Sequence, residues 1–221
     1  MLPIVIVWGT FSAPGLQAAS FTFEGQFTRD DQTALFDFTT AAANSVQIRT
    51  FGYAGGITAT GTVVPRGGFD PVLTLFDTNG VFLQDNDESS GVPVDSSTGE
   101  AADALLDVRL QPGHYIAALT QYGNFSSGNH LGDGFLEQGN PHFTADPNFS
   151  AAGPCPANLF RDTSGGPGRC RNGNWAVDFV NVSSATERNV SPVPEPRAFY
   201  SMILSFLVLL RWCGRSPQRP R

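Results

Sequence analysis

The sequence predicts an all-β protein: an antiparallel β-sandwich with one long loop insertion and a short hydrophobic helix at the C-terminus. Two observations indicate the sandwich. Apolar residues alternate with polar ones in many short segments, as a half-buried strand requires. Turn motifs separate these segments, which favours several short antiparallel strands. The alternating segments are Phe21-x-Phe23, Phe36-x-Phe38, Val46-x-Ile48, Leu73-x-Leu75, Leu106-x-Val108-x-Leu110, Tyr115-x-Ala117-x-Leu119 and Trp175-x-Val177-x-Phe179.

Two turn motifs predict how neighbouring strands connect. Thr78-Asn79-Gly80 lies between two apolar runs, and Asn-Gly supplies the positive φ angles of a tight hairpin. Gln111-Pro112-Gly113 lies between two further runs, and there we expect a type II turn with Pro at its second position and Gly at its third.

Charge is distributed unevenly along the chain. All 13 basic residues are arginines, and five of them follow Pro196. Residues 1–194 therefore hold 19 acidic residues against 8 arginines, a formal charge of −11. A body of this charge, without a basic stripe, is not expected to bind nucleic acid. Acidity of this kind mostly keeps an exported domain soluble.

The N-terminus is similar to a secretory signal peptide. An apolar stretch at residues 2–7 precedes Ala18-Ala19-Ser20, a small-residue sequence of the kind that precedes a cleavage site. No basic residue precedes the stretch, and Pro3 and Pro14 interrupt the segment, which is unusual for such a signal. We expect residues 1–19 to be a signal peptide.

The C-terminus contains three features in a fixed order. These are Val193, Pro194, Glu195 and Pro196, then an apolar run at residues 198–210, then an arginine-rich end at residues 211–221. Together they resemble the PEP-CTERM sorting signal. The resemblance implies export across the inner membrane, trimming at or near residues 194–196 by a membrane-embedded exosortase-type enzyme, and a cell-surface or extracellular product.

The length of the apolar run agrees with that role. Thirteen residues of helix extend about 20 Å, less than the roughly 30 Å hydrocarbon core. We therefore expect transient membrane insertion through residues 191–221, with the terminal arginines on the cytoplasmic side. A stable single-pass anchor and a core helix are the alternatives.

Removal of the tail would also remove Cys213 and leave Cys155 and Cys170, fifteen positions apart in a Gly/Pro-rich segment. Because an exported protein meets an oxidising compartment, we expect these two to form a disulfide. The alternative is a zinc site with His130 and His142, although the cysteines lack C-x-x-C spacing.

Residues 34–120 contain motifs in an order and spacing that are similar to the bacterial pre-peptidase C-terminal (PPC) domain. These motifs are Asp37-Phe38, Phe69-Asp70-Pro71-Val72-Leu73, Asp77-x-Asn79-Gly80, Asp85-Asn86-Asp87 and Leu110-x-Pro112-Gly113-x-Tyr115. The resemblance implies a jelly-roll or PPC-like β-sandwich over residues 20–190. Residues 123–174 depart from it as a Gly-, Asn-, Pro- and Phe-rich insertion. A loop of such length tends to be functional or mobile.

Acidic residues flank the predicted hairpin. They are, with one asparagine, Asp70, Asp77, Asn79, Asp85 and Asp87. Oxygen ligands of this kind suit calcium, so a calcium site is one interpretation. Solvated or turn-capping side chains are the other, and we favour it because Asp and Asn are common turn formers.

No catalytic template is found. The chain has no G-x-S-x-G, H-E-x-x-H or Walker motif, and it contains no lysine. His130 and His142 with Asp133 or Asp146 are the best enzyme candidate. The aromatic residues of the insertion suit either a lid over the sandwich or stacking on sugar rings, and we favour the lid. They are Tyr122, Phe125, Phe135, Phe143 and Phe149.

These observations lead to one expected function and two alternatives. We expect a non-enzymatic exported surface or matrix protein without a cofactor, associated with extracellular polysaccharide as the PEP-CTERM resemblance implies. The first alternative is a calcium- or carbohydrate-binding module, and the second is a secreted hydrolase that uses the insertion.

Overall fold

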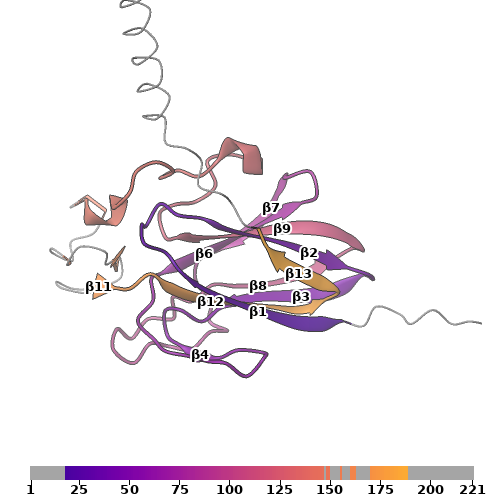
Figure 1. Cartoon of the computed structure of the whole chain (residues 1–221), viewed down its shortest axis with the longest axis horizontal. Coiled ribbons are helices and arrows are strands. Elements are labelled where there is room, and N and C mark those ends of the chain that lie inside the picture. Colours follow the sequence, from indigo (N-terminus) through magenta and orange to yellow (C-terminus); the bar gives the residue numbers. More distant parts are fainter. Residues whose placement is uncertain (1–17, 147, 150–154, 156–159, 163–169, 189–221) are drawn as a thin grey trace, which may run out of the picture. The chain divides into compact units, whose positions relative to one another are not determined.

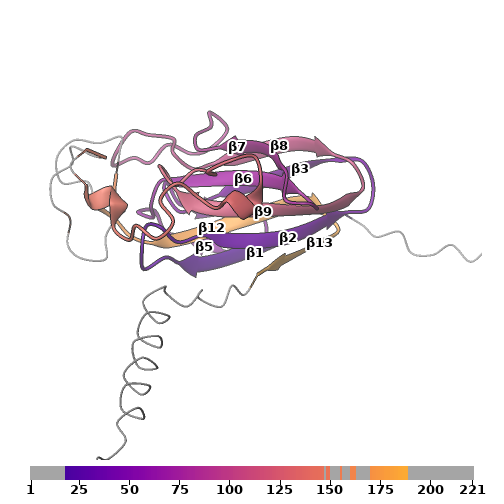
Figure 2. The same ribbon diagram turned by 90° about the horizontal axis from the view of Figure 1, so that it is seen from above.

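Two antiparallel sheets face each other and form the body of the protein (Figure 1, Figure 2). The computed structural model describes residues 18–146, 148–149, 155, 160–162 and 170–188. The four-stranded sheet has the order β1-β12-β3-β8 and the five-stranded sheet the order β13-β2-β9-β6-β7. The strands of the first sheet are β1 (Ala19–Gln26), β12 (Asn174–Val182), β3 (Asn44–Thr50) and β8 (Leu105–Leu110). Those of the second are β13 (Ser184–Glu187), β2 (Ala34–Thr40), β9 (Gly113–Gln121), β6 (Pro71–Asp77) and β7 (Phe82–Asn86).

The predicted all-β class and antiparallel sandwich are confirmed. The predicted C-terminal helix, the tail and most of the predicted signal peptide lie outside the described residues. Ala19, the last residue of that predicted signal peptide, begins β1 and pairs with Val182 of β12. The described unit ends at Arg188, the residue after β13. None of its helices is long and apolar enough to span a membrane.

The predicted hairpin between β6 and β7 forms at Thr78-Asn79-Gly80, but only Gly80, and not Asn79, has the expected positive φ. Gly80 has a φ of 82°, and its amide donates to the Asp77 carbonyl at 3.0 Å. The side chain of Asp77 also accepts hydrogen bonds from the amides of Asn79 and Val81, both at 2.8 Å. Asp77 therefore stabilises the turn.

The prediction for Gln111-Pro112-Gly113 is wrong. This turn does not join a hairpin, because β8 and β9 lie in different sheets. Gly113 is also absent from the described residues with positive φ, so the turn is not type II. Both edges of β9 are paired, with β2 and with β6, while β8 pairs with β3, so the chain crosses from one sheet to the other at this turn. The turn is instead held from the side, since the hydroxyls of Thr40 and Tyr115 both donate to the Gln111 carbonyl.

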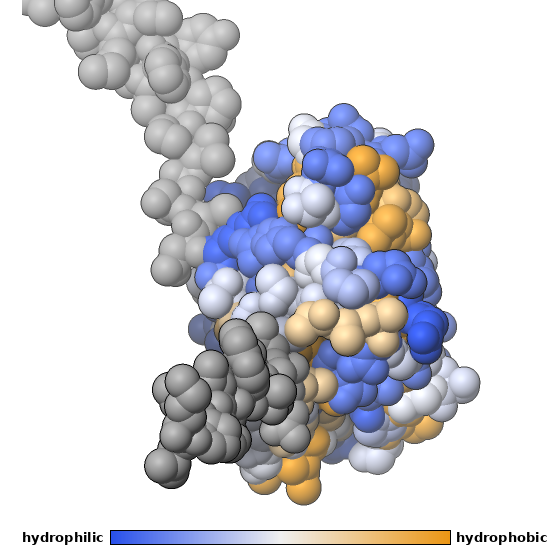
Figure 3. All heavy atoms as spheres, turned by 90° about the vertical axis from the view of Figure 1, so that its right-hand side faces the viewer, coloured by the Kyte–Doolittle hydropathy of each residue, from blue (hydrophilic) through white to orange (hydrophobic). Residues whose placement is uncertain are grey.

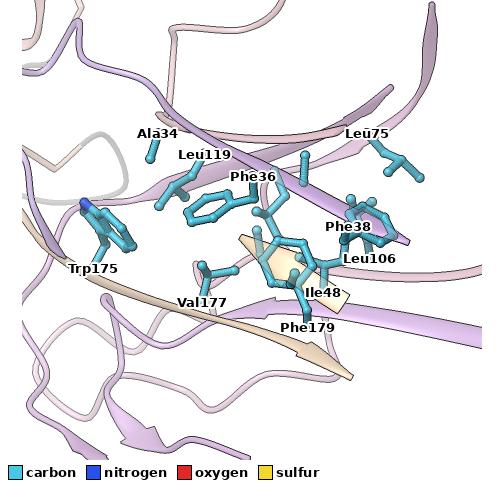
Figure 4. Packing of buried hydrophobic residues seen from close by; sticks show 14 of the residues in the cluster. Ala34, Phe36, Phe38, Ile48, Leu75, Leu106, Leu119, Trp175, Val177 and Phe179 are labelled. Carbon is cyan, nitrogen blue, oxygen red and sulfur yellow. The ribbon is translucent and has the colours of Figure 1, made fainter. Parts of the chain in front are cut away.

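The inner faces of the sheets enclose an aromatic core (Figure 4). Phe36 and Phe38 from one sheet pack on Phe179 from the other, with ring centroids 5.4 and 5.3 Å apart. Burying each such ring contributes roughly 1.5–3 kcal/mol. The alternating segments found in the sequence supply this core, so the period-two pattern is confirmed as a strand pattern.

The outer face of the five-stranded sheet is covered by part of the insertion. Phe135 and Leu131 pack there against Phe76, Ile116 and Ala118. Two short 3-10 helices, η1 (Leu131–Asp133) and η2 (Phe143–Ala145), and a two-stranded piece, β10 (Phe160–Arg161) with β11 (Cys170–Arg171), lie within the insertion. Phe135 and Phe143 are both buried, and the packing of Phe135 on the sheet confirms the predicted lid for that ring.

The outer face of the other sheet carries a small hairpin, β4 (Gly56–Ile57) with β5 (Val63–Val64). Buried Asp178 of β12 accepts hydrogen bonds from the Thr22 hydroxyl and the Ala59 amide and so fixes this hairpin. In the face shown in Figure 3, hydrophilic residues predominate and the hydrophobic ones form small separate groups.

Candidate functional site

Most buried carboxylates of the described residues hold loops in place. Asp30, only 3% exposed, accepts hydrogen bonds from the amides of His142, Phe143 and Thr144 and from the Thr144 hydroxyl. It therefore fixes the start of η2 on the loop between β1 and β2. Asp31 next to it accepts from the Gly139 amide at 3.1 Å.

A buried ion network joins three other loops. The Arg171 guanidinium contacts Asp162 at 3.0 Å and Asp95 at 2.7 Å, and it lies 3.5 Å from the centroid of the Tyr53 ring. The Tyr53 hydroxyl donates to Asp162 at 2.8 Å. Arg171 is 5% exposed, and both carboxylates are at most 1% exposed. This network ties the insertion to the loops before β6 and β8.

The disulfide lies beside that network. Cys155 and Cys170 are bonded, with their Cα atoms 5.6 Å apart, and Cys170 directly precedes Arg171. Phe160, within the closed loop, stacks on Phe69 at the end of the core with ring centroids 5.3 Å apart. Since both sulfurs are in the bond, they cannot ligate the alternative zinc ion.

The three histidines belong to three separate contacts. His114 pairs with Asp37 at 3.0 Å. His130 accepts at Nδ1 from the Gly132 amide, and its Nε2 lies 2.7 Å from the Asn79 carbonyl, to which it donates. His142, in a left-handed conformation, donates its amide to Asp30. The proposed pair of His130 and His142 does not share a carboxylate among the described residues.

Asp37 takes part in a further ion cluster at the end of the described chain. Arg188 contacts both Asp37 oxygens, at 2.5 and 2.7 Å. The hydrogen bond from Arg188 is the main cause that lowers the Asp37 pKa below its ordinary value of 3.8, and His114 adds to it. The cluster fixes β13 against β2 where the described chain ends.

Asp37→Asn is expected to lower stability at neutral pH by about 1 kcal/mol, because the cluster is partly exposed. Because the folded-state pKa lies below the ordinary 3.8, the contribution of Asp37 is fully present above 3.8 and is lost as the pH falls below that value, through the lowered pKa. The melting temperatures of the variant and the unchanged protein should therefore differ at about pH 7, and the difference should shrink as the pH is lowered below 3.8. Asp85→Asn, which removes the same charge from an exposed site, is the control and should show no such difference. A difference for D37N that persists at low pH would contradict this explanation.

The five residues of the candidate calcium site do not converge. Asp77 and Asn79 lie at the turn of the β6–β7 hairpin, whereas Asp70 and Asp87 lie at its other end, about 20 Å away along the strand. Asp85 is exposed in the middle of β7. Within the described residues, no group of three or more His, Cys, Asp or Glu side chains is placed to hold a metal ion. Asp77 caps the turn, in agreement with our preferred interpretation of these residues as turn-capping or solvated side chains.

A further group of polar side chains lies around Tyr122, directly after β9. At the open end of the β6–β7 ladder, Tyr122 lies near Asp70, Asp87 and Glu88, and the Tyr122 amide donates to the Asp70 carbonyl. Partial burial, followed by these three carboxylates, raises the pKa of the Tyr122 hydroxyl above 10.0. Among the described residues, this hydroxyl and the carboxylates of Asp87 and Glu88 have no hydrogen-bond partner. We call Tyr122, Asp87 and Glu88 the open-end patch.

Aromatic rings adjoin the open-end patch. Tyr122 packs edge to face on Phe125, with ring centroids 5.5 Å apart, and more loosely on Phe149, at 6.5 Å. All three rings are partly exposed, unlike Phe135 and Phe143. The predicted lid therefore does not account for these three.

Sequence reasoning gives Tyr122 and Asp87 as separate candidates but does not bring them together. It also misses the ion network of Arg171, Asp95 and Asp162. The only feature of the sequence that could have indicated this network is that Arg171 directly follows Cys170. Residues Val193, Pro194, Glu195 and Pro196 lie outside the described residues. No protein-family model and no curated protein matches the sequence.

Proposed function

We propose that the chain is a non-enzymatic protein that is exported across the inner membrane, trimmed at its C-terminus by an exosortase-type enzyme, and retained at the cell surface or in the extracellular matrix. On this proposal the sandwich is a PPC-like domain, and the tail at residues 191–221 serves only as a sorting signal. Extracellular polysaccharide is its proposed surroundings.

The observation that carries the non-enzymatic part is how the fold uses its ionisable groups. Asp30, Asp95 and Asp162 are buried and bonded to backbone amides or to Arg171, and His130 is held between a carbonyl and an amide. Acid–base catalysis needs a titratable group within hydrogen-bond reach of a substrate. Because these side chains are already hydrogen-bonded within the fold, they support a structural and not a catalytic role for the ionisable groups.

The cysteine pair supports the export part. A disulfide between Cys155 and Cys170 persists in an oxidising compartment and is rare in the cytosol. The order of Val193-Pro194-Glu195-Pro196, apolar run and arginines in the sequence supports the sorting route.

Glu195→Ala, made in the cell that produces the protein, tests the sorting route. We expect the variant to keep its C-terminal tail and to stay in the membrane fraction, whereas the unchanged protein is released from it. Glu187→Ala, which removes an acid eight residues earlier within β13, is the matched control and should be trimmed normally. If E195A is trimmed and released like the unchanged protein, the proposed route is wrong.

A further inference from the structure

We infer that two copies of this chain associate by pairing their β1 strands in antiparallel orientation, so that the four-stranded sheet of one copy continues into that of the other. The partner is a second copy of this chain, and the interaction surface is the free edge of β1. The inference goes beyond the proposed function and does not depend on export or trimming.

One edge of β1 pairs with β12, and the other edge is free. The Phe27 amide, directly after β1, donates to the Gly173 carbonyl at 2.8 Å, so the backbone groups of the odd-numbered residues in this stretch point toward β12. Because backbone groups alternate in direction along a strand, those of the even-numbered residues point away from β12. These residues are Ser20, Thr22, Glu24 and Gln26. Among the residues that the structure describes, none forms a hydrogen bond with their amides or carbonyls at this edge.

The other free edges of the two sheets are protected in the ways by which proteins prevent unwanted strand pairing. Exposed Asp107 and Arg109 place charges along β8. The edge of β7 is covered at its start, where the Phe82 amide donates to the Asn129 carbonyl at 2.9 Å. The third edge strand, β13, has only four residues. In contrast, β1 has eight residues with a single charge, at Glu24, and it is therefore the edge most open to another strand.

The charge pattern of β1 favours an antiparallel pair centred on Phe23. In that register Thr22 faces Glu24 of the second copy, and Ser20 faces Gln26. Every outward-facing amide and carbonyl from Ser20 to Gln26 then has a partner. The two copies of Glu24 do not face each other, which avoids the cost of like charges in directly opposite positions. The sequence of β1 is thus complementary to itself.

The apolar side chains of β1 supply favourable free energy for this pairing. Phe21 and Phe23 pack against the core, yet both are partly exposed on the last strand of the sheet. A second β1 would bring the two Phe23 residues opposite each other at a non-hydrogen-bonded position, with their Cα atoms about 4.5 Å apart. Phe21 would lie opposite Gly25, which has no side chain to obstruct the ring. Pairing would therefore remove apolar ring surface from water.

The net charge of the protein limits the affinity. The formal charge of −11 on residues 1–194 makes two copies repel each other, and an interface built on one strand is small. We therefore expect a weak dimer, with a Kd on the order of 10–100 µM. Salt screens the repulsion, so added salt should strengthen the association, whereas it would weaken an interface held by ion pairs.

Sedimentation velocity of the purified full-length protein in a mild detergent tests the inference. We expect the dimer fraction to rise with protein concentration, and to rise again when sodium chloride is increased from about 0.05 to about 0.5 M. Glu24→Pro removes an outward-facing amide hydrogen but none that bonds to β12, as an edge strand tolerates. It should weaken the association at least about tenfold.

Asp107→Pro is the matched control. The Thr50 amide donates to the Ala104 carbonyl, so the even-numbered residues of β8 point toward β3 and Asp107 points to the free edge. This variant therefore replaces an acid by proline at an outward-facing position on the opposite edge of the same sheet, and it should associate as the unchanged protein does. The apolar run at residues 198–210 is common to both variants, so association through that run cannot distinguish them.

Amide hydrogen exchange, followed by NMR, tests the same edge without a substitution and decides the question should E24P fail to fold. Exchange at Thr22, Glu24 and Gln26 should slow as the protein concentration rises, whereas exchange at Asp107 should stay constant. The inference is overturned if the protein stays monomeric, if salt dissociates the dimer, if folded E24P associates as D107P does, or if the three β1 amides exchange at the same rate at every concentration.

Discussion

Arg171→Met is expected to lower the stability of the protein by about 3–5 kcal/mol, because it removes the buried guanidinium that contacts both Asp95 and Asp162. Asp95 then keeps only its longer contact with the exposed Arg66, at 3.3 Å. Both carboxylates are at most 1% exposed, so water cannot replace the guanidinium. For a chain of this length, the melting temperature should fall by roughly 6–20 °C. Thermal unfolding followed by circular dichroism measures it.

Arg109→Met is the control for this variant. Arg109 is exposed in β8, and its replacement should change the melting temperature by no more than about 2 °C. If R171M melted within that range as well, the buried ion network would not be what holds the insertion to the sandwich.

The Cys155→Ser/Cys170→Ser double variant is expected to be less stable by about 3 kcal/mol, the chain-entropy value for a loop of fifteen residues. The loss should exceed that of an ordinary surface change, because Phe160 and Arg171 lie next to the two cysteines and pack at the end of the core. A reducing agent added to the unchanged protein should lower its melting temperature by the same amount.

Cys213→Ser is the matched control for the double variant, and it should melt as the unchanged protein does. The explanation fails if the double variant melts at the same temperature as C213S. It also fails if reduction changes the melting temperature of the double variant.

The strands could be predicted because one local rule defines them. Phe36, Ile48 and Phe179 alternate with polar residues, and each lies in the core. The pairing of strands could not be predicted in the same way. The turn at Gln111-Pro112-Gly113 has the composition of a hairpin turn, yet β8 and β9 on either side of it belong to different sheets. The composition of a turn does not show which strands pair.

The contacts that define the sites join residues far apart in the sequence. Arg171 meets Asp95 across 76 positions, and Asp30 meets Thr144 across 114. Neither a periodic pattern nor a short motif can indicate contacts between residues so far apart in the sequence. The candidate calcium ligands do not form one site, for a related reason. Asp77 and Asp87 are only ten positions apart in the sequence, but they lie at opposite ends of the β6–β7 hairpin.

The intact mass of the protein recovered outside the cell tests most directly whether this is an exported, trimmed β-sandwich. We expect a chain that begins near Ser20, ends at or near residues 194–196, and gains two hydrogens on reduction of the Cys155–Cys170 bond. An extracellular product that still contains Arg221 would contradict it.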